Sequence, residues 1–441
     1  MKTQSTKTAV MSVLAMLATA DMAFAQETTV PVVDKGDTAF MMLASVLVLF
    51  MTVPGLALFY GGLVRTKNML SVLMQCTMIT AVVIVAWVFY GYSFAFGGSA
   101  SPWWGGTAKL FLAGVNLQTT SATFTSGVVI PEYVFVVFQM TFACIAPALV
   151  IGAFVERIKF SAVMAFVLIW VTFAYLPIAH MVWDANGYLY GLGALDFAGG
   201  TVVHINAGIA ALVAAIAVGR REGLGRDLMA PHSMSLTMVG ASMLWVGWFG
   251  FNAGSNLEAN AGATLAMINT FTATAGAIIA WAVIESVLRG KASMLGAASG
   301  LVAGLVAITP AAGTVGPVGA IALGAIASGI CYLFVAVVKN RFGYDDSLDV
   351  FGIHGIGGIV GAIGTAPFSA AALGGVKGDE YSIASQTIIQ LQAVSLTIGW
   401  SAVVSAVALY AIKAVIGLRV PSDAERQGLD LASHGEAAYH S

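Results

Sequence analysis

The stretch GALDFAGGTVVHINAG, residues 193–208, places a carboxylate and an imidazole inside a run of small and apolar residues. Asp196 stands near its start, and His204 follows eight positions later. No further charge appears before Arg220. An uncharged run of about 20 residues is typical of a membrane-spanning helix. The titratable ring of His204 therefore needs an explanation, and the rest of the chain supplies one.

The composition of the chain excludes an ordinary soluble domain. Of its 441 residues, 59% are hydrophobic and 9% are charged, whereas globular domains carry about 25% charged residues. This balance predicts an all-α integral membrane protein. A net charge of −2 provides no basic field for nucleic acid. Cys76, Cys144 and Cys331 all lie in apolar runs, so neither a disulfide framework nor a metal cluster is expected.

The first 25 residues have the pattern of a cleaved signal peptide. Two lysines form a basic head, residues 9–18 are mostly apolar, and an Ala-Phe-Ala cleavage pattern ends at Ala25. A first transmembrane helix is the alternative, but this apolar run is too short to cross about 30 Å of hydrocarbon. Residues 26–417 are then the transmembrane domain, and residues 418–441 form a tail.

Apolar runs of about 20 residues mark the spans. They predict eleven transmembrane helices, at 38–60, 70–96, 133–154, 162–182, 197–218, 233–253, 263–287, 294–310, 316–338, 349–368 and 390–416.

The basic residues orient these helices, because Lys and Arg collect in cytoplasmic loops. With the N-terminus outside, the outer segments hold only Lys35, Lys109 and Lys377. The predicted inner loops hold Arg65, Lys67, Arg157, Lys159, Arg220, Arg221, Arg226, Arg289, Lys291, Lys339 and Arg341. Together with the signal peptide, this pattern predicts a multi-pass protein of a bacterial inner membrane, surrounded by membrane lipid. Its N-terminus is periplasmic and its C-terminal tail is cytoplasmic. The polar, charged composition of the tail by itself suggests a solvated extension.

A second segment, DVFGIHGIGG at residues 349–358, follows the same pattern as the first. It opens with an acid, runs through Phe and Gly, and presents His354. The first segment lies in the fifth predicted helix and the second in the tenth. Five is an odd number, so a five-plus-five repeat has to be inverted in the membrane, with one further helix at the C-terminus. At about 1.5 Å per residue, His204 and His354 both reach the middle region, from opposite faces.

The acids and the histidines of the two segments receive different interpretations. Asp196 and Asp349 are expected to cap helix N-termini, where a carboxylate accepts backbone hydrogen bonds and meets a favourable dipole. The histidine pair is interpreted as functional, because ionisable residues within spans usually mark a pathway or a proton relay. Metal binding is disfavoured, since no cysteine or second carboxylate joins the pair at ligand spacing. The other histidines are interpreted as structural or solvated: His180, His232, His434 and His440.

The predicted pore favours a small solute that can lose a proton. Neutral imidazoles accept and pass protons, but they do not replace the rings of carbonyls or acids in cation channels. Aromatic rings near the outer ends of spans attract cations, and Ser255 adds a hydrogen-bond acceptor. These features point to ammonium. A belt of aromatic residues at the membrane surface is the alternative for any one of the rings.

Six stretches of the chain carry a resemblance to a known family. They are GALDFAGGTVVHINAG, GWFGFNAGS, AFVERIKFSA, IAHMVW, DVFGIHG and the tail GLRVPSDAERQGLDLASHGEAAY. In these stretches the sequence resembles the Amt/Mep/Rh family of ammonium transporters, on its Amt side. The resemblance covers essentially the whole chain after the first 25 residues.

The resemblance implies a mechanism in which the protein recruits NH4+, deprotonates it and conducts NH3, with or without a separate proton. The implied roles are outer recruitment of ammonium (Phe142, Trp183, Ser255 and Asp196), gating (Phe142 and Phe251), a twin-histidine pair in the pore (His204 and His354) and pore lining (Trp248). The implied fold is a homotrimer with one pore in each subunit. No cofactor and no metal is implied.

The resemblance also implies partners and leaves rivals open. The tail is similar to tails that bind a cytoplasmic PII-type signal protein, and methylammonium is the expected substrate analogue. One alternative is an ammonium sensor. Another is a channel for a different small neutral molecule. An enzyme is not expected, because the chain has neither a G-x-S-x-G nor an H-E-x-x-H motif.

Overall fold

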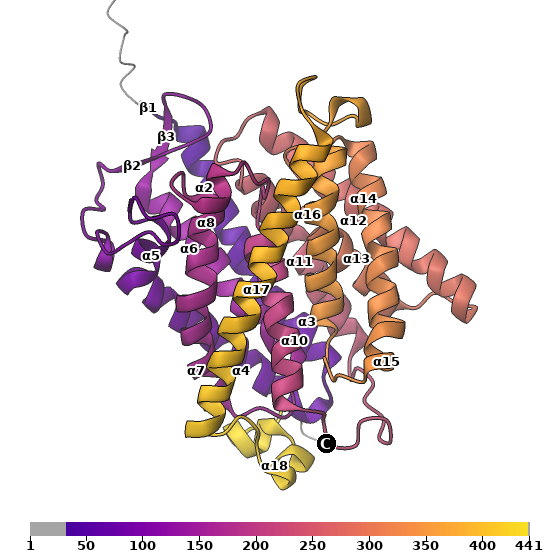
Figure 1. Cartoon of the computed structure of the whole chain (residues 1–441). Helices are drawn as coiled ribbons and strands as arrows, with labels where there is room; N and C mark the ends of the chain where they lie inside the picture. The colour runs from indigo at the N-terminus through magenta and orange to yellow at the C-terminus, as the bar shows by residue number, and fades with distance from the viewer. Residues whose placement is uncertain (1–31, 440–441) are drawn as a thin grey trace, which may run out of the picture.

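Residues 32–439 are described by the computed structural model of the chain, and they form a bundle of helices with a small sheet at one end (Figure 1). The predicted signal peptide, residues 1–25, lies outside the described residues, as does His440. The α-helices are α2 (Lys35–Phe50), α3 (Ala57–Leu63), α4 (Met69–Ala86), α5 (Tyr92–Phe96), α6 (Glu132–Val150), α7 (Phe160–Trp170), α8 (Leu176–Trp183), α9 (Tyr188–Gly191), α10 (Asn206–Val218), α11 (Met234–Gly254), α12 (Ala261–Arg289), α13 (Met294–Ile308), α14 (Pro317–Leu333), α15 (Lys339–Phe342), α16 (Ile356–Phe368), α17 (Ile383–Val415) and α18 (Ser422–Gln427).

Short π-helical and 3-10 turns interrupt or extend these helices. The π-helical turns are η1 (Met51–Leu56), η3 (Trp87–Gly91), η6 (Val171–Tyr175), η7 (Gly200–Ile205), η8 (Phe334–Val338), η9 (Phe351–Gly355) and η11 (Asp430–His434). The 3-10 turns are η2 (Thr66–Asn68), η4 (Leu110–Leu112), η5 (Ile151–Ala153) and η10 (Ala371–Leu373). π-helical turns are frequent at functional sites, and here two of them, η7 and η9, carry His204 and His354.

The sheet has three strands, β1 (Val32–Val33), β2 (Thr120–Ala122) and β3 (Val128–Pro131), in the order β1-β3-β2. β1 runs parallel to β3, and β2 runs antiparallel to it. We call this end of the bundle the sheet face. The opposite end carries α18 and the C-terminus, and we call it the tail face (Figure 1).

The helical membrane fold predicted from the sequence is confirmed. Among residues 32–439, ten helical segments are long and apolar enough to cross a membrane. The predicted span at 294–310 corresponds to α13, which is apolar but has only 15 residues. This is short of the roughly 20 residues that a perpendicular crossing needs, so the count of eleven stays a prediction.

The two histidine-bearing segments run in opposite directions. α10 ends at Val218, and the next residue, Gly219, accepts a hydrogen bond from Arg157 at the tail face. η9 and α16 instead begin at the tail face, just after Asp345, whose backbone oxygen is bound by the same Arg157. This antiparallel arrangement is the one that an inverted repeat requires.

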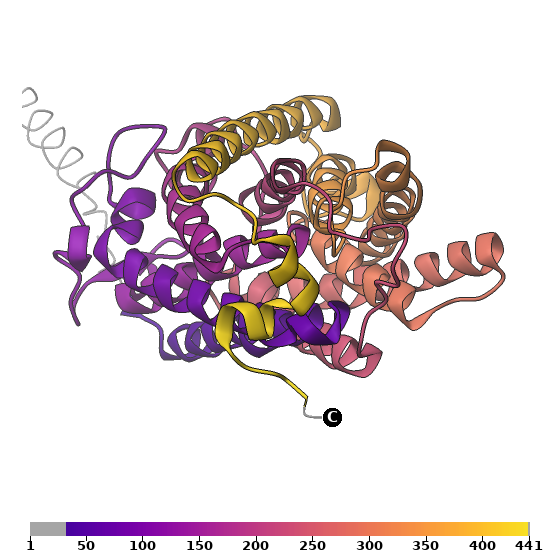
Figure 2. The same ribbon diagram turned by 90° about the horizontal axis from the view of Figure 1, so that it is seen from below.

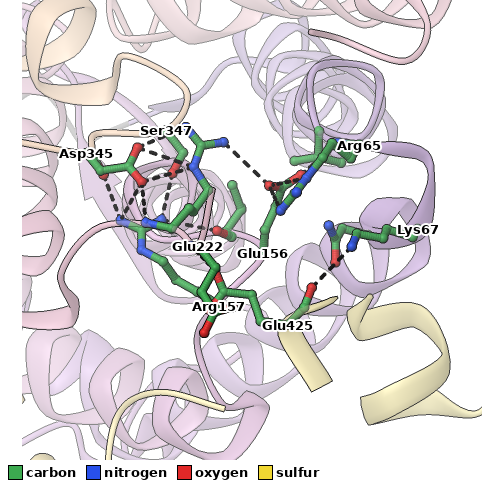
Figure 3. A network of polar contacts seen from close by, with 12 residues as sticks. Arg65, Lys67, Glu156, Arg157, Glu222, Asp345, Ser347 and Glu425 are labelled. Carbon is green, nitrogen blue, oxygen red and sulfur yellow. Dashed lines mark hydrogen bonds and ion pairs between the residues drawn. The ribbon is translucent and has the colours of Figure 1, made fainter. Parts of the chain in front are cut away.

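A polar network holds the loops of the tail face together (Figure 3). The fully buried Arg157 donates to Gly219 O at 2.7 Å, to Ser347 Oγ at 2.7 Å and to Asp345 O at 2.7 Å. Arg221 pairs with Asp345 through Nη2 and Oδ1 at 2.9 Å. Glu156 accepts from the backbone N and Nε of Arg65, at 2.8 and 2.9 Å. Hydrogen bonds and ion pairs of these charged residues therefore join four loops that are far apart in the sequence.

The tail packs against the tail face. Its composition had suggested a solvated extension instead. In the view from below (Figure 2) it lies across the end of the bundle beside the N-terminal helices. Glu425 is buried and accepts from Glu222 N at 2.7 Å. Asp430 is also buried, and it accepts from Leu70 N and Ser71 N at 3.1 and 2.7 Å. Asp430 thus caps the N-terminus of α4, so the tail is built into the fold.

Candidate functional site

A cavity of about 360 Å³ opens at the sheet face, between the ends of α6, α8 and α11. Its lining includes all four residues predicted for outer recruitment: Phe142, Trp183, Asp196 and Ser255. The indole Nε1 of Trp183 donates to the backbone oxygen of Asp196 at 3.0 Å. This bond fixes the Trp183 ring relative to the loop that precedes η7.

The Asp196 carboxylate is occupied by backbone hydrogen bonds. Oδ1 accepts from Gly199 N and Gly200 N at 3.0 and 2.5 Å. Oδ2 accepts from Thr201 N and Val202 N at 2.9 and 3.1 Å. Four amides at the start of η7 therefore share one buried carboxylate. Asp196 acts as the expected helix cap, and it shapes the cavity by holding the segment that leads to His204.

Two phenylalanine rings lie against each other at one end of this cavity, and one of them, Phe142, lines it. The rings of Phe142 and Phe251 lie with centroids 4.2 Å apart and planes at 30°. Trp183 meets Phe142 edge-on, with centroids 5.7 Å apart. Phe142 and Phe251 are both buried. Phe142 lines the outer cavity and Phe251 contacts His204, so the two rings lie between this cavity and the histidines.

Below the phenylalanines, the two histidines from the two repeated segments meet. Nδ1 of His354 lies 3.2 Å from Nδ1 of His204, and the rings are stacked at 5.3 Å. His204 also stacks on Trp248 at 5.3 Å and lies 5.9 Å from Phe251. Trp248 is held in place by donating from Nε1 to Thr309 Oγ1 at 2.9 Å. The sequence analysis predicted that the two rings reach the middle region from opposite faces, and the contact between them is consistent with that.

The Nδ1–Nδ1 contact has a chemical consequence. Between two neutral rings, one Nδ1 carries the proton and donates, and the other accepts. The donating ring then has a bare Nε2, and the accepting ring has a protonated Nε2. Nε2 of His204 has no hydrogen-bond partner among the described residues. The pair therefore presents one acceptor and one donor at its two Nε2 atoms.

A second cavity, of about 150 Å³, reaches the pair from the tail face. His354 lies in its lining with Tyr60, Ser347 and Asp349. The rings of Trp183, Phe142, Phe251, His204 and His354 thus form a continuous column between two cavities on opposite faces.

The prediction that Asp349 caps its helix is wrong. Asp349 has a φ of 61°, outside the extended region that an N-cap residue adopts. Its carboxylate is paired with Lys339 instead. The cap is Asp346, which accepts from Val350 N at 3.1 Å and from Phe351 N at 2.7 Å.

Most residues that line the outer cavity were not predicted from the sequence, and two of them, Phe138 and Gln139, bear directly on the site. Phe138 lines it and meets Phe142 edge-on at 4.9 Å. Gln139 lines it too, and its buried Oε1 has no hydrogen-bond partner among the described residues. Phe138 stands one helical turn before Phe142, so the i, i+4 spacing could have indicated a shared face. Gln139 carries no comparable signal.

The three other histidines within residues 32–439 are not part of the column. His180 is buried, with Nδ1 and Nε2 each 2.8 Å from the backbone oxygens of Ala95 and Ser101. Nδ1 of His232 is 2.9 Å from Val64 O, and the ring of His434 packs on Phe160. Within the part of the chain that the structure describes, no group of three His, Cys, Asp or Glu residues is placed to hold a metal ion.

Comparison with known proteins gives one family. The model of the Ammonium Transporter Family matches residues 39–439. The ammonium transporters of Aquifex aeolicus and Bacillus subtilis are 49% and 44% identical to this chain. Each alignment covers 92% of this chain, with 94% and 98% of the relative.

Solved structures agree. A sensor Amt protein superimposes with a TM-score of 0.83 at 28% identity, over 90% of this chain and 98% of its own. Mep2 of Candida albicans superimposes with a TM-score of 0.80 at 34% identity, over 88% of this chain and 87% of its own. Family membership places the chain among transporters and channels rather than enzymes. The chain belongs to the ammonium transporter family.

Proposed function

We propose that this protein transports ammonium by taking up NH4+ in the outer cavity, removing a proton and conducting NH3 past the histidine pair. The observation that carries the proposal is the column of five rings between the two cavities. Membership of the ammonium transporter family supports the substrate. No protein cofactor is needed for a proton transfer of this kind.

The outer cavity has groups suited to a small cation that gives up water. The π face of Trp183 supplies an attraction worth about 0.5–2 kcal/mol. Ser255 Oγ donates its own proton to Phe251 O at 2.9 Å, so its lone pairs are left to accept from ammonium. Oε1 of Gln139, which has no hydrogen-bond partner within residues 32–439, is a further acceptor in the lining. Together these groups replace part of the hydration shell of NH4+, and none of them carries a full negative charge.

The column beneath the cavity favours the neutral form. The apolar rings of Phe142 and Phe251 offer no ligands for a bare cation, so passing the gate as NH4+ would carry a large desolvation cost. Ammonia can both donate and accept hydrogen bonds, and this matches the donor and the acceptor that the neutral histidine pair presents. The proton leaves by a separate route that involves the histidines.

The arrangement in the membrane follows from the same proposal. The sheet face is periplasmic and the tail face is cytoplasmic, since the basic loops gather with the tail. Residues 1–25 are removed as a signal peptide, residues 26–417 form the transmembrane domain, and residues 418–441 are the tail. The assembly in a bacterial inner membrane is a homotrimer, and a PII-type protein binds the tail and inner loops.

Currents in proteoliposomes test the proposal. An ammonium pulse should give a saturable current in the wild type that is lost in His204→Ala and in His354→Ala. His232→Ala, at the tail face and outside the column, is the matched control and should conduct normally. Fast internal alkalinisation without current would make the protein a neutral ammonia channel. Absence of both signals from intact protein would contradict transport.

The likeness to a sensor Amt protein supports one second candidate, ammonium sensing by the same site. A sensor without transport would bind methylammonium saturably, produce neither current nor alkalinisation, and change its contact with a cytoplasmic partner when ammonium is added. The same proteoliposomes therefore separate the two candidates.

A further inference from the structure

We infer that Gln390 is a positioning residue for the outer ammonium site, a role that rests on the proposed function. Gln390 lies on α17, the last long helix, about 200 positions from the site in the sequence. Its side chain is buried, with 1% of its surface exposed. A buried primary amide on a lipid-spanning helix has to find partners within the protein, and here the partners belong to the pore.

The Gln390 amide binds both edges of one residue beside Asp196. Oε1 accepts from Leu195 N at 2.8 Å, and Nε2 donates to Leu195 O at 2.8 Å. The Gln390 amide therefore pairs with the backbone of Leu195 through two hydrogen bonds, as a neighbouring β-strand would. The Leu195 carbonyl belongs to the peptide that carries Asp196 N. Gln390 therefore fixes the approach of the chain to Asp196, whose backbone oxygen holds Trp183 and whose carboxylate caps η7.

The same amide also reaches the second copy of the repeat. The other Nε2 proton is donated to Ala362 O on α16, at 2.8 Å. α16 continues directly from η9, which carries His354. The Gln390 side chain of α17 thus binds two segments at once. One is the loop that leads to the His204 segment, and the other is α16, the helix that follows His354. Since Ala194, Leu195 and Asp196 all line the outer cavity, a change at Gln390 moves the cavity wall.

Methionine, glutamate and a neighbouring glutamine make a matched set of variants. Gln390→Met keeps the length of the side chain and removes every hydrogen bond. Gln390→Glu in its neutral form keeps one donor and one acceptor, enough to retain the pair with Leu195. Gln386 lies one turn away and donates to Gly193 O at 3.0 Å and to Gln390 Oε1 at 3.3 Å. Gln386→Met therefore removes a similar group from the same helix but leaves both bonds between Gln390 and Leu195 in place.

Current against ammonium concentration in proteoliposomes is the first measurement. Gln390→Met should raise the half-saturating ammonium concentration about tenfold, the effect expected for losing a buried hydrogen-bonded group. Its maximal current per reconstituted molecule should stay near the wild type. Gln390→Glu should lie between the two, and Gln386→Met should shift the half-saturating concentration less than Gln390→Met, because it keeps both bonds to Leu195. Equal shifts in Gln390→Met and Gln386→Met, or a loss of maximal current alone, would overturn the role.

Hydrogen exchange of the amides at 193–202 is the second measurement, and it does not depend on transport. Gln390→Met should exchange faster there than Gln386→Met. If the wild type conducts no ammonium, the proposed function fails while this exchange still decides whether Gln390 positions the segment. If Gln390→Met does not fold, Gln390→Asn, whose amide is one methylene too short to keep both bonds to Leu195, is compared with Gln386→Asn, and equal exchange in that pair contradicts the role.

Discussion

At the scale of single residues, Trp183 connects the outer cavity to the rest of the site. Its indole faces the cavity, meets Phe142 edge-on and donates to Asp196 O. The residue therefore combines an indole ring, the aromatic group that attracts cations best, with a fixed orientation. Any attraction that it adds to NH4+ is realised without ordering a flexible side chain at the moment of binding.

Replacing Trp183 by leucine should weaken uptake and leave the fold intact. Loss of a cation–π contact of about 0.5–2 kcal/mol predicts a rise of about 2- to 30-fold in the half-saturating ammonium concentration. Trp103→Leu is the control, because Trp103 is 42% exposed and stacks on Tyr188 outside the column. Concentration series of the ammonium current give both values. An equal shift in both variants would assign the effect to the aromatic surface instead.

Much of the candidate site could be predicted from single residues. The histidine pair could be found because a titratable residue in an apolar run is rare and two runs share one pattern. The partners of these residues could not be found in the same way. Asp346 and Asp349 both precede the second histidine, and only the backbone conformation decides which carboxylate reaches the free amides. Gln390 contacts Leu195 across almost half the chain, and no local spacing indicates that.

At the scale of elements, the crossing of α10 and η9 fixes the distance between the histidines. Gly208 lies one turn after His204, and Gly355 directly follows His354. A Cβ on Gly208 would clash with the backbone N and Cα of Gly355. The two segments thus approach at backbone contact, as helices in membranes do where small residues face each other.

Gly208→Ala should therefore separate the histidines. Overpacking of this kind typically costs about 1–3 kcal/mol, so we expect a lower Tm and a smaller ammonium current per folded molecule. Gly399→Ala is the control, because a Cβ there meets no atom within 4 Å and Ala favours a helix by about 1 kcal/mol over Gly. Thermal unfolding in detergent and proteoliposome currents give the two readouts. Wild-type behaviour of Gly208→Ala would show that the crossing tolerates more space than its geometry suggests.

The corrected helix cap gives a second prediction at this scale. Asp346→Ala should cost about 0.5–2 kcal/mol of stability, because two amides at the start of η9 lose their acceptor. Asp349→Ala should cost less, since its ion pair with the partly exposed Lys339 is of the kind worth about 0–1 kcal/mol. Chemical or thermal unfolding of the two variants measures the order. The reverse order would restore Asp349 as the more important carboxylate.

Helix positions could be predicted more fully than helix ends and turns. The apolar runs are long, and their composition alone separates them from the loops. Composition does not show where a helix widens into a π-helical turn, as at η7 and η9, because that depends on how neighbouring segments pack. Composition also gave the wrong expectation for the tail, which it suggested to be a solvated extension. The tail acids Glu425 and Asp430 are instead buried against α4 and nearby loops.

At the scale of the whole molecule, the charged residues of the tail face join loops that connect helices from distant parts of the sequence (Figure 3). Burial opposes the charge on Glu156, but Arg221 and Arg65 outweigh burial and leave its pKa below the ordinary value. Burial also opposes the charge on Asp345, and Arg221 with Arg157 again lowers the net pKa. Burial lowers the pKa of Arg157 to about 10, so the guanidinium stays charged at neutral pH.

The lowered pKa values of Glu156 and Asp345 predict that acid reduces the stability of the folded protein by protonating these two carboxylates. A carboxylate whose folded pKa lies below its unfolded pKa, about 4 for Asp and Glu, adds stability above that pH and loses it as pH falls through the folded pKa. The Tm of the purified protein in detergent should therefore drop as the pH is lowered below about 4.

Asp345→Asn separates this network from general acid effects. It leaves Arg221 without its closest charge partner and Arg157 beside a neutral side chain, which for buried pairs typically costs about 3–5 kcal/mol. We expect a lower Tm at pH 7 and a flatter fall below pH 4, because one of the titrating groups is gone. Glu380→Gln, in an exposed loop of the sheet face, should keep the wild-type profile. If Asp345→Asn fell as steeply in acid as the wild type, the loss of stability would have to begin elsewhere, and the tail-face charges would serve to place the loops and the tail rather than to stabilise the bundle.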